Sequence, residues 1–78
     1  MKLTETQKRK IEEIANLASF AYYKKKSISA DPSAEANTII AISHVLRVFG
    51  YDLRERSWKR EHMGIDYAVF KVVDWDFK

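Results

Sequence analysis

Two histidines, His44 and His62, are the side chains of this sequence best suited to acid–base chemistry. Either could in principle combine with Asp52, Asp66 or Ser57 in a hydrolytic centre. Their spacing matches no catalytic triad, nucleophile elbow or metalloprotease motif, and the chain has no glycine-rich phosphate loop or cysteine. We therefore expect no enzyme activity, no metal and no cofactor. His44 is expected as a hydrogen-bonded residue at a helix edge, and His62 as a solvated turn residue.

Basic residues surround a tryptophan between residues 54 and 60. The cations of such a segment can contact phosphates while the indole stacks on a base. The chain from residue 51 onward nevertheless carries six basic and six acidic side chains, so it is neutral overall. The sequence also has no helix-turn-helix signature with a hydrophilic recognition helix. Nucleic-acid binding is therefore the alternative function. Its candidate residues are Arg54, Arg56, Trp58, Lys59 and Arg60.

Aromatic side chains are more numerous than one small hairpin face needs. Exposed aromatic residues are enriched at protein interfaces, although the same rings could pack over the hairpin within one monomer. We predict a small non-catalytic protein-interaction or regulatory module that forms a homodimer or binds a partner protein. The simplest homodimer pairs hairpin edges into a four-stranded sheet. The predicted contact residues are Phe20, Tyr23, Trp58, Trp75 and Phe77.

The elements that position these residues begin with a helix predicted from about Leu3 to Ser27. Thr4 and Gln7 have the spacing of a capping box, and apolar residues recur at helical spacing after them. Three lysines at residues 24–26 suit the negative end of the helix dipole. The polar residues that fall outside the apolar stripe include Glu12, Glu13, Asn16 and Ser19.

A second helix is predicted to begin after Asp31, with Asp31 as its N-cap and Pro32 as its first residue. It ends at Phe49, where Gly50 is suited to a left-handed C-terminal cap. Apolar residues occupy most of its circumference. Such a helix must be covered on more than one side.

The remaining chain predicts a hairpin. The stretch from Ile65 to the C-terminal end is rich in β-branched and aromatic residues, and its three aspartates all fall on the parity opposite to most of them, which is typical of a strand. The stretch from Tyr51 to Arg60 is predicted as a strand, although its composition also suits a helix. Residues 61–64 form the loop, in which Gly64 favours a positive φ. The predicted cross-strand charge pairs are Arg60 with Asp66 and Glu55 with Lys71.

These elements predict one α+β domain over residues 1–78, in which two antiparallel helices are followed by a C-terminal β-hairpin packed on the second helix. The predicted core consists of Ile11, Ile14, Ala18, Ile39, Ile42, Val45, Leu46, Phe49, Leu53, Val69 and Val73.

Charge is unevenly distributed along the 78 residues, whose net charge is +3. Residues 1–30 carry a charge of +4, residues 31–50 carry −1, and the remainder is neutral. The aromatic residues gather largely in the neutral part, which favours a protein partner over a nucleic acid. The sequence contains no apolar stretch long enough for a signal peptide or a membrane span. We therefore expect a cytoplasmic protein without membrane contact.

A capped basic helix, an apolar helix that ends in Phe49-Gly50-Tyr51, and a charged, aromatic hairpin follow one another in this chain. In this order of elements and their composition, the sequence resembles small uncharacterised proteins of bacteriophages and mobile elements. The resemblance implies a binding role, such as action on a host protein. The chain departs from the acidic DNA-mimic type because it is basic overall. The resemblance assigns a role to no individual residue.

Overall fold

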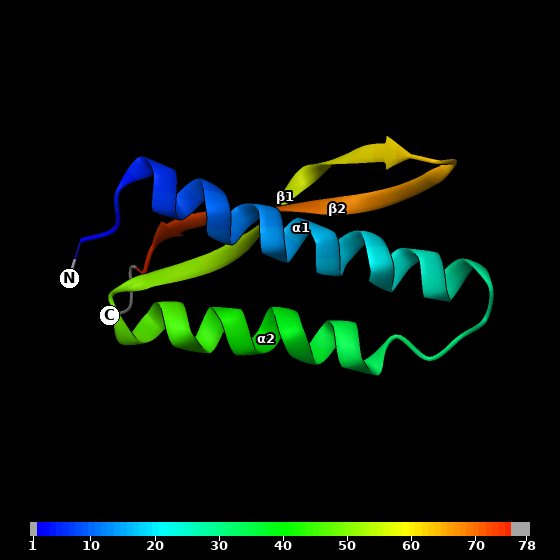
Figure 1. The fold of residues 1–78 in the computed structure, drawn as a ribbon, viewed down its shortest axis with the longest axis horizontal. Helices are drawn as coiled ribbons and strands as arrows, with labels where there is room; N and C mark the ends of the chain where they lie inside the picture. Colours follow the sequence, from blue (N-terminus) through cyan, green and yellow to red (C-terminus); the bar gives the residue numbers. More distant parts are fainter. Residues whose placement is uncertain (1, 76–78) are drawn as a thin grey trace.

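Two antiparallel helices precede an antiparallel hairpin (Figure 1). The computed structural model describes residues 2–75, except for the side chains of residues 57–59. The helices are α1 (Glu5–Ser27) and α2 (Ser33–Val48), and the strands are β1 (Tyr51–His62) and β2 (Ile65–Asp74). The predicted α+β class and element order are confirmed, and residues 54–60 belong to a strand and not to a third helix.

The helix ends follow local hydrogen-bonding signals. The predicted capping box is present, because Thr4 Oγ1 accepts from the amide of Gln7 at 3.1 Å and Gln7 Oε1 accepts from the amide of Thr4 at 2.9 Å. The prediction of Asp31 as N-cap is wrong by one position, since Pro32 occupies the N-cap and α2 begins at Ser33. Asp31 still serves this end, because its Oδ1 accepts from the Ser33 amide at 3.0 Å.

The hairpin turn is tighter than the predicted four-residue loop. His62 lies opposite Ile65, so that Met63 and Gly64 alone form the turn, with φ of 53° and 78°. Two successive positive φ values are typical of a type I′ turn, whose twist matches that of the flanking strands. This turn pairs Arg60 with Tyr67, and a second register shift between Glu55 and Lys59 pairs Glu55 with Phe70, so both predicted charge pairs are wrong. The observed opposite residues include two like-charged pairs, Arg54 with Lys71 and Glu61 with Asp66.

The pairing of the strands is irregular at the middle of the hairpin. Glu55 lies opposite Phe70 and Lys59 lies opposite Ala68, so that residues 56–58 of β1 face Val69 alone. Extra residues in one strand bend it and increase its twist. The hairpin accordingly crosses behind α1, and its tip lies on the side of α1 opposite to α2 (Figure 1).

The sequence predicted a hairpin packed on the second helix. In the structure the hairpin packs on α2 and also on α1. Strand β2 contacts α1, and β1 contacts α2. The cluster of buried apolar side chains lies where the four elements meet. Its members are Leu3, Ala15, Leu46, Tyr51 and Leu53, with Ala68 and Val69 also buried.

The predicted core is only partly buried. Leu46, Leu53 and Val69 are buried as predicted. Five further predicted core residues are half-buried: Ile11, Ala18, Ile39, Ile42 and Val73. The prediction is wrong for three residues, which are exposed: Ile14, Val45 and Phe49.

A polar side of α1 explains this difference, because it faces the edge of β2. Glu12 Oε2 accepts from the Val72 amide at 2.9 Å, and Asn16 Oδ1 accepts from the Phe70 amide at 2.8 Å. One further helical turn along, the buried hydroxyl of Ser19 donates to the carbonyl oxygen of Ala68 at 2.5 Å. Polar side chains of a helix thus satisfy backbone groups that a third strand would otherwise pair.

Candidate functional site

The apolar side of α1 is turned away from the strand that its polar side contacts. At about 100° per residue, Ile14 lies about 200° around the helix from Glu12. Ile14 is 55% exposed and Leu17, one turn later, is 70% exposed. Because the polar side of α1 binds the strand edge, Ile14 and Leu17 remain at the surface.

The neighbouring side of α2 is also apolar and exposed. Val45 is 59% exposed and Val48, one turn later, is 78% exposed. A groove of about 410 Å³ runs between the two helices at this side. Its lining consists of Ile11, Ile14, Thr38, Ala41, Ile42, Val45 and Leu46.

We call the surface formed by this groove together with Leu17 and Val48 the helix face. Positions three residues apart are neighbours on a helix surface, so Leu17 extends the row of Ile14 and Val48 extends the row of Val45. Soluble monomers rarely expose contiguous apolar patches beyond a few hundred Å², and larger ones mark sites of protein interaction. The helix face is therefore a candidate docking surface.

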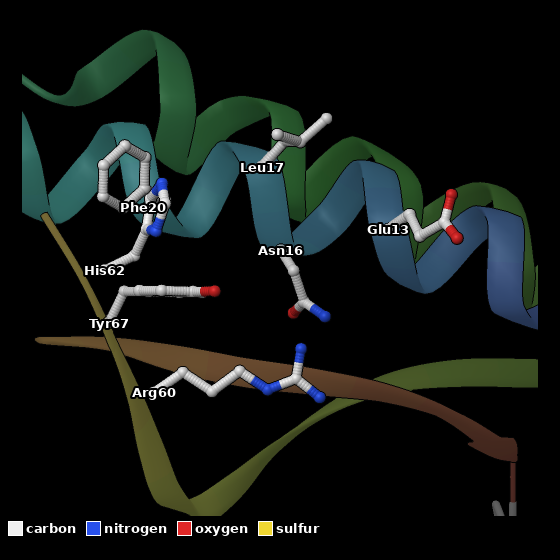
Figure 2. Close-up of a pocket in the computed structure, with 7 residues that line it drawn as sticks. All are labelled: Glu13, Asn16, Leu17, Phe20, Arg60, His62 and Tyr67. Carbon is white, nitrogen blue, oxygen red and sulfur yellow. The ribbon is translucent and has the colours of Figure 1, made fainter.

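A second recess, of about 500 Å³, separates α1 from the hairpin tip. Figure 2 shows its lining residues, with Asn16 reaching in from α1 and Arg60 from the hairpin. The ring of Phe20 packs edge-on against His62, with centroids 5.2 Å apart, and against Tyr67 at 5.5 Å. This recess combines aromatic walls with amide, guanidinium and hydroxyl groups. The full lining is Glu13, Asn16, Leu17, Phe20, Arg60, His62 and Tyr67.

The predicted aromatic contact residues lie in different places. Phe20 packs on the hairpin of its own chain, as described, and the half-buried Tyr23 meets Tyr22 edge-on with centroids 5.0 Å apart. Trp75 is 39% exposed, and the Arg47 guanidinium lies over its ring, 5.4 Å from the centroid. The side chain of Trp58 and the whole of Phe77 lie outside the part of the chain that the structure describes.

The candidate nucleic-acid residues are divided by the irregular strand pairing. Arg54 precedes the irregularity and Arg56 lies within it, and both are exposed. Arg60 follows the irregularity and lines the recess beside α1. The side chains of Trp58 and Lys59 are not described. The structure thus places Arg54 and Arg60 on differently oriented parts of the hairpin.

The carboxylate of Asp52 is bound at the junction of α2 and β1. Its Oδ1 accepts from Ser43 Oγ at 2.7 Å, from the Leu53 amide at 2.8 Å and from Arg47 Nε at 3.2 Å. Burial alone would raise the pKa of Asp52, but these hydrogen bonds and the charge of Arg47 outweigh burial and hold the pKa below its ordinary value. Asp52 is therefore a structural anion that joins the helix to the strand.

The two histidines differ in their surroundings. His44 is exposed on α2, while His62 ends β1 and meets Phe20 in the recess. Residues 2–75, as far as they are described, contain no group of three histidine, cysteine, aspartate or glutamate side chains that could hold a metal ion. Neither α1 nor α2 is long and apolar enough to cross a membrane.

Of the four exposed aliphatic residues of the helix face, the sequence analysis assigned Ile14 and Val45 to the core and did not select Leu17 or Val48. One signal was available, since α2 carries more apolar positions than a single neighbouring helix covers. The sequence did not show that α1 offers its polar side to the sheet. Comparisons of the chain with protein-family models, with curated proteins and with solved structures found no match.

Proposed function

We propose that this chain is a small non-catalytic protein-interaction module whose docking surface is the helix face. One observation carries the proposal. Four aliphatic side chains on adjoining sides of α1 and α2 are more than half exposed, and the hairpin of the same chain does not cover them. They are Ile14, Leu17, Val45 and Val48.

The energetics of burial support this assignment. Complete burial of a valine, leucine or isoleucine side chain is worth about 1.5–3 kcal/mol. Each of the four side chains retains more than half of its exposure. A partner that covers them therefore gains about 1 kcal/mol or more from each, before the cost of association.

The predicted aromatic surface has weaker support. The contacts of Phe20 with His62 and Tyr67 lie within the chain, which favours the alternative that these rings pack over their own hairpin. Pairing of hairpin edges between copies is disfavoured at β2, where Glu12 and Asn16 already accept the edge amides. Trp75 remains a candidate at the margin, because part of its ring is exposed.

A photo-crosslinking amino acid at position 17 tests the proposal and does not require the partner to be identified first. The matched control carries the same group at Ile28, which is equally exposed at 70% but lies after the end of α1. Both proteins are added to a lysate of the source organism and irradiated. We expect a discrete protein adduct, with this chain or with another, from position 17 and not from position 28. Equal labelling from both positions, or none, would contradict the proposal.

A further inference from the structure

We infer that the helix face binds a second copy of this chain, so that two helix pairs stack face to face around a twofold axis. The inference rests on the proposed function and names its partner. In such a dimer each copy covers the apolar surface that its own hairpin leaves exposed. Two stacked pairs of antiparallel helices have the geometry of a four-helix bundle.

The relief of the helix face suits packing of helices on helices. Within the groove Leu46 is buried and Ile11 and Ile42 are half-buried, whereas Ile14 and Val45 are more than half exposed. Helices pack by placing the ridges of one into the grooves of another. Because a twofold interface is self-complementary, the ridges of one copy can enter the groove of the other in both directions at once.

Charge also favours a second copy at this surface. The chain carries +3 overall, and like charges that oppose one another across an interface disfavour association. All seven residues that line the groove are uncharged. At the border, Lys10 is already paired with Glu13 of the same helix at 3.7 Å. Two identical helix faces can therefore meet without opposing their net charge.

The area available fits a reversible dimer. A helix of the length of α2, 16 residues, is about 24 Å long, and two adjacent helices are together about 20 Å wide. Each copy thus offers roughly 500 Å², and the pair buries roughly 1,000 Å², which is the lower limit of specific interfaces. We expect monomer and dimer to exchange across the micromolar concentration range, and not an obligate dimer.

Sedimentation equilibrium of the purified full chain across that range tests the inference. The double variant Leu17→Lys/Val48→Lys changes the two most exposed of the four large aliphatic residues of the helix face. The control Ile28→Lys/Met63→Lys adds the same charge at residues that are exposed to a similar degree but lie outside this face. We expect the face variant to weaken dimerisation at least tenfold and the control to retain it. Far-ultraviolet circular dichroism confirms that both variants fold.

A single thiol provides a second measurement, because the chain has no cysteine. We expect the maleimide reaction of Ala41→Cys to slow as protein concentration rises, since the partner copy covers the groove. Ile28→Cys is expected to react at a constant rate. This result does not depend on the behaviour of the charged variants.

The outcomes separate the inference from the proposed function. If the wild type is a monomer at all concentrations but still crosslinks to another protein from position 17, the inferred homodimer is overturned, whereas the helix face remains a docking surface for that other protein. A monomer without such crosslinks would overturn both. A dimer that withstands Leu17→Lys/Val48→Lys but dissociates on Trp75→Ala would assign self-association to the hairpin and overturn the inference.

Discussion

The side-chain oxygen of Asn16 accepts a hydrogen bond from the backbone amide of Phe70 at 2.8 Å, across 54 residues of sequence. Glu12 makes the equivalent contact with Val72 one helical turn earlier. Helix α1 therefore lies against the edge of β2 through polar side chains. This orientation turns Ile14 and Leu17 toward the surface, so the hydrogen bonds to the strand edge and the exposed helix face have a single cause.

Replacement of Asn16 tests this relationship. We expect Asn16→Leu to lower the free energy of unfolding by about 1–3 kcal/mol, because the partly buried amide of Phe70 loses its acceptor. Asn16→Asp keeps an oxygen acceptor and is expected to retain most of the stability. Urea denaturation measures both changes.

The matched control for this experiment is Asn37→Leu, at an exposed position of α2. Exposed substitutions of this kind usually change stability by less than about 0.5 kcal/mol. Similar losses for Asn16→Leu and Asn37→Leu would show that leucine itself, and not the lost acceptor, is responsible.

Local signals predicted the elements well because each depends on neighbours in sequence. Thr4 and Gln7 predicted the start of α1, and both are in the capping box. Gly50 and Gly64 predicted left-handed positions and have φ of 88° and 78°. The predicted hairpin register was wrong for two reasons: Met63, a residue without turn preference, joins Gly64 in a two-residue turn, and the pairing shifts again between Glu55 and Lys59.

The orientation of α1 could not be predicted from its periodicity. A hydrophobic stripe normally indicates the buried side of a helix, and on this rule Ile14 belongs to the core and Ser19 to the surface. In the structure Ser19 is 1% exposed and Ile14 is 55% exposed. Glu12, Asn16 and Ser19 do recur at helical spacing, but a row of polar residues at that spacing normally indicates the exposed side of a helix. The candidate docking surface was therefore indicated only by the apolar excess of α2.

The first residue of the hairpin turn offers a stabilising substitution. Met63 adopts a φ of 53° and is 76% exposed, so it has an unfavourable backbone conformation and little packing to lose. Asparagine tolerates this conformation and is preferred before glycine in type I′ turns. We expect Met63→Asn to raise the free energy of unfolding by about 0.5–1 kcal/mol, measured by urea denaturation. Met63→Ala is the control, and an equal gain from it would contradict the conformational explanation.

Acid should weaken the junction between α2 and β1 through Asp52. Its pKa lies below the ordinary value of 3.8, because hydrogen bonds from Ser43, Arg47 and the Leu53 amide outweigh the opposing effect of burial. A carboxylate whose pKa is lowered by folding adds stability that is fully present above its ordinary pKa and lost as the pH falls through the lowered value. We expect Asp52→Asn to reduce stability by about 1–3 kcal/mol at pH 7.

The pH dependence of that difference identifies its origin. The stabilities of wild type and Asp52→Asn in urea denaturation should begin to converge below about pH 4 and meet once the pH is below the lowered pKa of Asp52, where the wild-type carboxyl is neutral as well. Other carboxyl groups titrate in both proteins and cancel in the comparison. Ser43→Ala removes one donor to Asp52 and keeps the charge, so we expect a smaller loss that follows the same pH course. A difference that stays constant down to about pH 2 would show that asparagine perturbs packing at the junction, and that the charge of Asp52 does not stabilise it.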